Sequence, residues 1–181
     1  MSYSLILGGA RSGKSRYAEE QATKLSNRTG WPVIYLATAT VTDPEMAHRI
    51  AQHQSERPQS WTTVEEPLEV TSWLSQAHKP LIVLLDCLSL LLNNWMFVDP
   101  DDSHRWVLRQ NQFYEALVQF PYPIIVVSNE VGQGIVPDNP LARQYRDALG
   151  RFNQILAATA DPAILMVAGL PIDLRKVGPS W

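Results

Sequence analysis

Eight consecutive residues near the start of the sequence, GGARSGKS, have the composition of a loop that binds phosphate. They match G-x-x-x-x-G-K-[ST], follow a short apolar run and precede a segment of helical period, which is the context this pattern requires. In such a loop backbone N–H groups point at phosphate oxygens, and the helix start, a lysine and a hydroxyl for Mg²⁺ complete the site. The residues are Gly8, Gly9, Ala10, Arg11, Ser12, Gly13, Lys14 and Ser15, with Lys14 as the predicted catalytic cation and Ser15 as a metal ligand.

A second chemical group lies at the end of the apolar run Leu81 to Leu85, where Asp86 follows directly. Nucleotide chemistry needs an acidic partner for the metal, and a carboxylate at a strand end suits this role, so we predict Asp86 as the second Mg²⁺ ligand. An aspartate in this place also caps turns, and that alternative stays open. Cys87 beside it is better explained as a core thiol than as a nucleophile, because no base lies near it in the sequence.

Three residues spaced by four, Arg49, His53 and Arg57, form one stripe if the segment from Asp43 is a helix. Two cations beside one imidazole would keep a ring nitrogen free to attack phosphorus and would hold phosphate oxygens. His48 lies about 140° away around such a helix, so a zinc site with two histidines is disfavoured. A solvated helix face explains the same stripe, and periodicity alone does not decide between the two interpretations.

Short apolar runs alternate with segments of helical period, and this alternation predicts an α/β fold with a mostly parallel sheet. Asn139-Pro140 is a typical helix start, and Pro58 should end the helix from Asp43 near Glu56. The predicted strands are Leu5 to Leu7, Val33 to Leu36, Leu81 to Leu85, Ile124 to Val127 and Ile164 to Val167. The predicted helices are Lys14 to Leu25, Asp43 to Glu56, Pro67 to Gln76, Ser103 to Phe120 and Leu141 to Ala158, and the stretch Asn93 to Asp102 is predicted as a surface loop.

The composition limits what the protein binds and where it works. With 181 residues we expect one domain, and a net charge of −3 without a Lys/Arg-rich run argues against nucleic acid or an anionic membrane as partner. The longest apolar runs are far shorter than the roughly 20 residues of a membrane-spanning helix. The lone cysteine, Cys87, and the lack of a leader pattern predict a cytoplasmic protein.

Several separated segments together resemble one family, the bifunctional adenosylcobinamide kinase and adenosylcobinamide-phosphate guanylyltransferase of cobalamin biosynthesis. These segments are GGARSGKSRYAE, YLATA, DPEMAHRIAQHQSERPQSWTTVEEP, LLDC and SNEVGQGIVPDNPLARQYRDALGRFNQILA, and they cover nearly the whole chain. The phosphate loop by itself is unspecific, whereas NEVGxGIVP followed by LAR-x-x-RD-x-x-G-x-x-NQ is typical of this family.

The resemblance implies a single RecA-like phosphate-loop domain, residues 1–181, that works with Mg²⁺ and with GTP or ATP. It implies phosphorylation of adenosylcobinamide, followed by transfer of GMP from GTP to adenosylcobinamide phosphate with loss of pyrophosphate. The family's R-I-x-x-H-x-x-x-R-P segment places the covalent GMP-histidine of the second step at His53. The family also implies a homo-oligomer, a trimer.

By the same match the nucleotide contacts fall on the phosphate loop and on a further set of residues. Gln54 stands where a basic residue is frequent in the family, and Asp86 where some members have glutamate. Asn129 and Glu130, after the strand from Ile124, reach the same edge of the sheet without an assigned role. The further contacts are Ala37, Thr38, Ala39, Gln54, Ser55, Glu56, Arg57, Glu65 and Asp86.

Other functions remain compatible with a phosphate loop. A small-molecule kinase or a nucleotide-binding switch would make His53 irrelevant, and GTP would leave no label on the protein. A RecA-like DNA motor is disfavoured by the acidic net charge.

Overall fold

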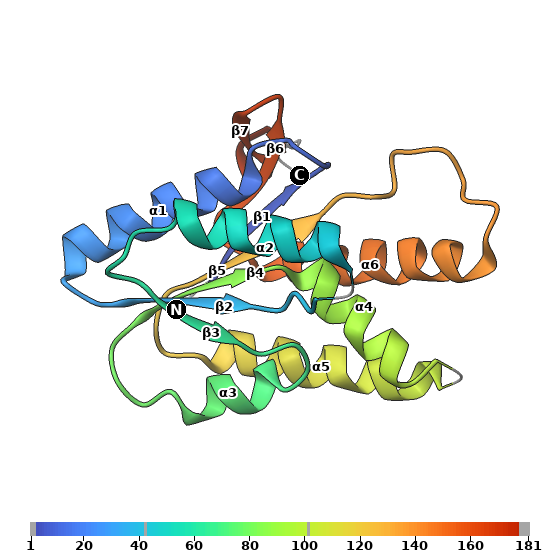
Figure 1. Cartoon of the computed structure of the whole chain (residues 1–181), viewed down its shortest axis with the longest axis horizontal. Coiled ribbons are helices and arrows are strands. Elements are labelled where there is room, and N and C mark those ends of the chain that lie inside the picture. The colour runs from blue at the N-terminus through green and yellow to red at the C-terminus, as the bar shows by residue number, and fades with distance from the viewer. Residues whose placement is uncertain (1–2, 42, 101, 178–181) are drawn as a thin grey trace.

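The computed structural model describes residues 3–41, 43–100 and 102–177, without the side chains of residues 49 and 56. In this part of the chain seven strands form one sheet in the order β3-β2-β4-β5-β1-β6-β7 (Figure 1). All neighbouring strands are parallel except β6 and β7, which pair antiparallel. The strands are β1 Ser4–Gly8, β2 Val33–Ala37, β3 Thr62–Glu65, β4 Ile82–Asp86, β5 Ile124–Asn129, β6 Ala163–Val167 and β7 Leu170–Asp173.

Helices cover both faces of the sheet, but unequally. The buried side chains of α3, α4, α5 and α6 share one hydrophobic core with the strands, and the buried alanines of α1 belong to a second core on the opposite face. Figure 1 shows α1 and α2 together on the near side. The helices are α1 Lys14–Thr29, α2 Pro44–Glu56, α3 Val70–Gln76, α4 Leu88–Val98, α5 Ser103–Gln119, α6 Pro140–Thr159 and α7 Leu174–Val177.

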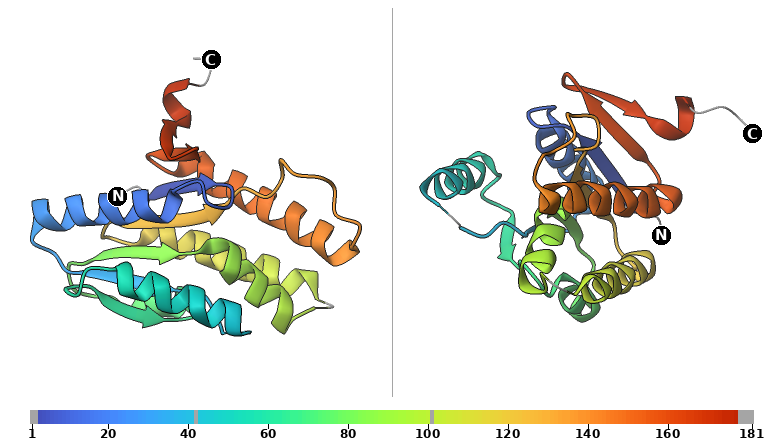
Figure 2. Two further views of the ribbon diagram at one scale, coloured as in Figure 1. Left: turned by 45° about the horizontal axis from the view of Figure 1, so that its top comes forward. Right: turned by 90° about the vertical axis from the view of Figure 1, so that its right-hand side faces the viewer.

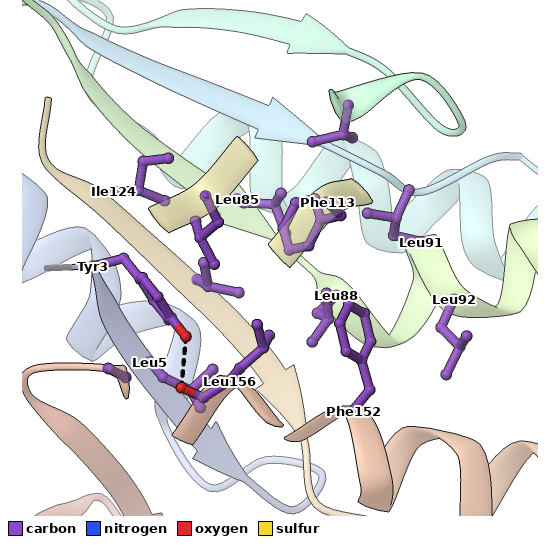
Figure 3. Close-up of a cluster of buried hydrophobic side chains, with 14 of the residues drawn as sticks. Tyr3, Leu5, Leu85, Leu88, Leu91, Leu92, Phe113, Ile124, Phe152 and Leu156 are labelled. Carbon is purple, nitrogen blue, oxygen red and sulfur yellow. Dashed lines mark hydrogen bonds between the residues drawn. The ribbon is translucent and has the colours of Figure 1, made fainter. Parts of the chain in front are cut away.

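The central strands are apolar because both of their faces are buried. Ile82, Val83, Leu84 and Leu85 of β4 are each at most 1% exposed, so both sets of alternating side chains contribute to a core. Parallel sheets between two helical layers characteristically show such continuous apolar runs. Figure 3 shows the larger core, where the phenol of Tyr3 also donates a hydrogen bond of 2.6 Å to the backbone oxygen of Leu156.

Two predicted helix starts are confirmed in their capping geometry. Asn139 Oδ1 accepts hydrogen bonds from the N–H groups of Leu141 and Ala142, at 2.8 and 3.3 Å. Asp43 Oδ1 accepts one from the N–H of Met46 at 2.8 Å. In both helices proline takes the first helical position, where it has no intrahelical hydrogen bond to lose.

The prediction of a surface loop over residues 93–102 is wrong for its first six residues. Asn93 to Val98 belong to α4, because the apolar period continues through Trp95 and Met96, which are buried. Within this helix Asn94 uses its amide to donate to the backbone oxygens of residues 38 and 67. Residue 101 lies outside the described residues.

The remaining differences concern the two edge strands, two helices and the bounds of two others. Strands β3 and β7 and helices α4 and α7 were not predicted, α3 begins three residues later than expected, and α1 continues four residues further. Strands β3 and β7 are at the two edges of the sheet and are mostly exposed, so their sequences lack a buried apolar run.

Candidate active site

The predicted phosphate loop connects the end of β1 at Gly8 to the start of α1 at Lys14. Gly13 has φ +90°, a conformation that favours glycine, and Arg11 is also left-handed with φ 56°. The N–H of Ser12 donates to the backbone oxygen of Gly9 at 3.3 Å, and Lys14 Nζ donates to the same oxygen at 3.3 Å. The loop therefore folds back on itself in front of the α1 N-terminus, the arrangement that presents N–H groups to an anion.

Gly8 is required by a close approach of chain segments. A Cβ atom built at this position would meet the side-chain oxygen of Ser12 and would come within 2.9 Å of the backbone oxygen of Met166. At Gly9 nothing described lies within 4 Å of such an atom. The first glycine thus serves packing, whereas a side chain at the second would meet open space.

The hairpin between β6 and β7 supports the loop from the side. The N–H of Gly169 donates to the backbone oxygen of Ser12 at 3.0 Å. Ser12 Oγ is buried and has no hydrogen-bond partner among the described residues. A buried hydroxyl without a partner is costly, and a phosphate oxygen in the loop would relieve that cost.

Asp86 ends β4, and its strand is separated from β1 only by β5. Its carboxylate oxygen Oδ2 accepts a hydrogen bond of 2.8 Å from the phenol of Tyr35. Among the described residues Asp86 forms no ion pair with a lysine or arginine, so its charge is available to a cation.

The donors at this edge fit Mg²⁺. Ser15 Oγ and the Asp86 carboxylate are hard oxygen ligands, and Mg²⁺ is typically held by one or two protein oxygens together with substrate phosphates and water. Within the described ranges no cluster of three or more His, Cys, Asp or Glu side chains could hold a metal by itself. A nucleotide would therefore have to bring part of the coordination sphere.

Thr38 connects the ends of β2 and β4 from a fully buried position. Its hydroxyl accepts from the backbone N–H of Cys87 at 2.9 Å and donates to the backbone oxygen of Cys87 at 2.7 Å. Its own backbone N–H donates to the oxygen of Asp86 at 3.2 Å, and its backbone oxygen accepts from Asn94 at 2.8 Å. Its polar groups are therefore engaged within the protein, while Ala37 and Ala39 are half-buried beside it.

Helix α2 carries His53, Gln54 and Ser55 on an exposed segment. The right-hand view of Figure 2 shows this helix standing away from the other helices, on the α1 side of the sheet. In the described part of the chain no hydrogen bond joins His53 to the phosphate loop. Gln54 Nε2 donates to Glu65 Oε1 at 3.4 Å, so the end of α2 is connected to the end of β3.

The predicted stripe of Arg49, His53 and Arg57 does not form as expected. Arg57 is the residue after the helix, with extended backbone, because Pro58 disfavours helical geometry in the residue before it. Its guanidinium lies 3.4 Å above the ring of Tyr35, and its Nη1 donates to Thr63 Oγ1 at 3.3 Å. The side chains of residues 49 and 56 lie outside the described residues, so their predicted contacts stay predictions.

Sequence reasoning missed Tyr35, which lies between Arg57 and Asp86. It is 3% exposed, and its burial, followed by the nearby charge of Asp86, raises its pKa well above the ordinary value of 10.0. A signal was present in the sequence: Tyr35 is the one residue with a polar group in the apolar strand Val33–Ala37. A buried tyrosine usually has a hydrogen-bond partner for its hydroxyl.

Other polar residues at this edge are held by the protein. Asn129 Nδ2 donates to Ser89 Oγ at 2.8 Å, and Glu130 Oε1 accepts from the N–H of Gly132 at 2.7 Å. Burial raises the pKa of Cys87 to about 11, which agrees with a core thiol rather than a nucleophile.

The sheet, the loop after β1 and the carboxylate two strands away define a phosphate-loop nucleotide-binding protein of the α/β class, as the sequence predicted. The family model described as cobinamide kinase / cobinamide phosphate guanyltransferase matches residues 4–174, and the chain belongs to this family.

Two curated relatives, one from Pseudomonas aeruginosa and one from Escherichia coli, agree with this assignment. The chain is 44% identical over 172 residues to the bifunctional adenosylcobalamin biosynthesis protein CobP of Pseudomonas aeruginosa, covering 94% of this chain and 96% of that protein. It is 38% identical over 183 residues to the bifunctional adenosylcobalamin biosynthesis protein CobU of Escherichia coli, covering 94% and 98%. The solved structure of an ATPase domain matches with a TM-score of 0.49 and 14% identity over 91% of this chain and 68% of that one.

The helices of the described ranges are either too short or too polar to cross a bilayer. None of them combines the length and the apolar composition that crossing a membrane requires.

Proposed function

We propose that this protein phosphorylates adenosylcobinamide and then transfers GMP from GTP to the adenosylcobinamide phosphate so formed. The observation that carries this proposal is the family match over residues 4–174, combined with a phosphate loop folded in front of the α1 N-terminus. Both reactions displace a group at phosphorus, so one phosphate-binding loop can serve both of them.

In the first reaction a hydroxyl oxygen of the corrinoid attacks the terminal phosphorus of ATP or GTP. The new P–O bond forms as the bond to the leaving diphosphate breaks, and the hydroxyl proton goes to solvent or to a carboxylate at the sheet edge. The loop N–H groups and Lys14 stabilise the charge on the phosphate oxygens. Ser15 and Asp86 would hold Mg²⁺, which when bound neutralises charge on the phosphates.

In the second reaction a ring nitrogen of His53 attacks the α-phosphorus of GTP, and pyrophosphate leaves. A phosphate oxygen of adenosylcobinamide phosphate then attacks the same phosphorus and displaces the histidine. His53 is exposed, so its ring is accessible to both partners. Attack requires the reacting atoms to approach to about 3–3.5 Å. We infer that α2 moves toward the loop when nucleotide is bound.

The preference for guanine over adenine is assigned to the end of β3. Glu65 is exposed there, and its carboxylate is an acceptor that suits the N–H donors of a guanine edge. Its hydrogen bond with Gln54 is long, at 3.4 Å, so little is lost when the base replaces that contact. The backbones at Ala37 and Ala39 lie at the same edge.

The proposal includes a homo-oligomer, a trimer by family resemblance, in the cytoplasm. The edge strand β7 supports association, since Leu170 and Ile172 are 68% and 36% exposed. The cytoplasmic location rests on the single cysteine of the sequence. Light scattering coupled to size exclusion would give the mass, and a particle of one 20.4 kDa chain would contradict the oligomer.

The deciding experiment is incubation of the pure protein with Mg²⁺ and GTP labelled at the α-phosphate, followed by denaturation. We expect protein-bound label that is acid-labile and base-stable, as a phosphoramidate is. His53→Asn should carry none. His48→Asn is the matched control, because His48 lies exposed on the same helix but on a different face. It should label like the wild type.

Each other result has a distinct meaning. Label on His53→Asn would move the nucleophile to another residue. No label on any variant, in a protein shown to bind GTP, would contradict guanylyltransfer and leave a phosphate-loop kinase or a nucleotide-binding switch.

A further inference from the structure

Four side chains from three strands and one helix end lie in a row on the α1 face of the sheet. Tyr35 pairs with Thr63 of β3 on one side and with Leu84 of β4 on the other, and Asp86 is the next residue on the same face of β4. Arg57, the residue after α2, lies over Tyr35 and bonds Thr63. The row therefore runs from the end of α2 to the metal-side carboxylate.

We propose that Tyr35 is a positioning residue with two contacts. It orients Asp86 for the metal, and it holds in place the C-terminal end of α2, the helix that carries His53. Its hydroxyl donates a hydrogen bond to one carboxylate oxygen of Asp86, and the guanidinium of Arg57 stacks on its ring. The proposal rests on the proposed function for the roles of Asp86 and His53.

The hydrogen bond to Asp86 leaves the carboxylate with one committed and one available oxygen. Oδ2 accepts from the phenol at 2.8 Å, whereas Oδ1 has no hydrogen-bond partner among the described residues. A tyrosine that is 3% exposed cannot turn its hydroxyl elsewhere without leaving the core. The carboxylate is thus held in one orientation before a cation binds, and groups that hold metal ligands in this way contribute strongly to affinity.

The ring of Tyr35 provides the second contact. Arg57 Cζ lies 3.4 Å from the ring centroid, a stacked cation–π arrangement, and Arg57 Nε is buried without a hydrogen-bond partner among the described residues. The guanidinium also donates the 3.3 Å bond to Thr63, which is long for a hydrogen bond. The position of the Arg57 guanidinium consequently depends on the Tyr35 ring more than on the hydrogen bond to Thr63.

Two substitutions separate the two contacts. Tyr35→Phe removes the hydroxyl and keeps the ring, and Tyr35→Leu removes both. Tyr3→Phe is a matched control, because Tyr3 is also buried, at 2% exposure, and donates its hydroxyl proton in the core away from this row.

The first readout is binding, not turnover. Calorimetry gives the affinity for GTP with Mg²⁺ and with EDTA. The ratio of these two affinities is the gain due to the metal, or metal gain. Tyr35→Phe should reduce this gain by about tenfold or more, as loss of a group behind a metal ligand does, and leave the affinity in EDTA unchanged. Tyr3→Phe should change neither. Asp86→Asn should remove the gain, and adding Tyr35→Phe to it should have no further effect.

The second readout is labelling of the histidine with α-labelled GTP at saturating Mg²⁺. Tyr35→Leu should label more slowly than Tyr35→Phe, because only Tyr35→Leu loses the aromatic ring on which the Arg57 guanidinium stacks. Thr63→Val, a surface change that leaves the core intact, should slow labelling less than Tyr35→Leu does and should not alter the metal gain.

An unchanged metal gain in Tyr35→Phe, or additive losses in the double variant, would overturn the positioning role. Equal labelling rates in Tyr35→Phe and Tyr35→Leu would overturn the proposal that the Tyr35 ring holds the end of α2 in place. A wild type that gains affinity from Mg²⁺ but performs neither reaction would contradict the proposed function alone, because the binding readout would still decide the role of Tyr35.

Discussion

The hydroxyl of Thr38 is hydrogen-bonded twice to the backbone of Cys87, accepting from its N–H at 2.9 Å and donating to its oxygen at 2.7 Å. One side chain thereby replaces the backbone pairing that β2 and β4 lose as both strands end. Since Cys87 directly follows Asp86, this bond pair also fixes the backbone that carries the metal-side carboxylate. The end of the sheet is held rigid where the nucleotide phosphates are expected.

Replacing Thr38 by Val should destabilise the protein, because the shape is kept while the buried N–H of Cys87 loses its partner; the backbone oxygen of Cys87 keeps the N–H of Leu91 at 3.1 Å. The expected decrease in the free energy of unfolding is about 1–3 kcal/mol, measured by urea denaturation. Thr38→Ser keeps the hydroxyl and should recover most of the difference. A loss in Thr38→Ser as large as that in Thr38→Val would contradict the prediction, because the hydrogen bonds would then contribute no more than the methyl group.

The two leading glycines of the phosphate loop should respond differently to alanine. Gly8→Ala forces a Cβ atom against Ser12 and the Met166 backbone and should cost about 1–3 kcal/mol of stability, as overpacking does. Gly9→Ala has open space at the same atom and should fold normally. Thermal unfolding of both variants tests this, and a Gly9→Ala protein as unstable as Gly8→Ala would contradict the assignment.

His53 and Lys14 should separate the two reactions. His53→Asn should abolish GMP transfer to adenosylcobinamide phosphate and leave the kinase step near the wild-type rate, because the first reaction does not involve the imidazole. Lys14→Ala should slow both steps by about a hundredfold or more, since both develop charge on phosphate oxygens held by the loop. Separate assays with each substrate measure the two rates. Normal transfer by His53→Asn would refute its role.

Stability at high pH should depend on Tyr145. Its burial, followed by the proximity of Cys87, raises its pKa from the ordinary 10.0 to about 12, and its hydroxyl donates to the backbone oxygen of Ser89 at 3.0 Å. A raised pKa means that the folded state binds the proton more tightly than the unfolded chain. The contribution is fully present below pH 10 and is lost as the pH rises toward about 12.

Urea denaturation across this pH range should therefore show a steeper fall in the free energy of unfolding for the wild type than for Tyr145→Phe. The comparison isolates Tyr145, because the other tyrosines are common to both proteins. Parallel curves would contradict the prediction.

The sequence by itself determined the local features of this protein. The phosphate loop, the apolar central strands, the strand-end position of Asp86 and the capped start at Asn139 all follow from residue types at short separations. Local hydrogen-bonding preferences and the burial of both strand faces act within a few residues, so they are visible in a single sequence. The family resemblance also depended on such contiguous segments.

Only the tertiary structure decided which distant side chains meet. The contacts of Tyr35 with Asp86 and with Arg57 depend on the order β3-β2-β4 and on the register that places Tyr35 one step behind Asp86 on the same face. The sequence grouped Arg57 with His53 because helical spacing was extended one residue past the predicted helix end at Glu56, and it made Asn93 to Val98 a loop because it could not see what covers Trp95. Strand order and helix packing arise from burial summed over the whole sheet, and no local spacing encodes that sum.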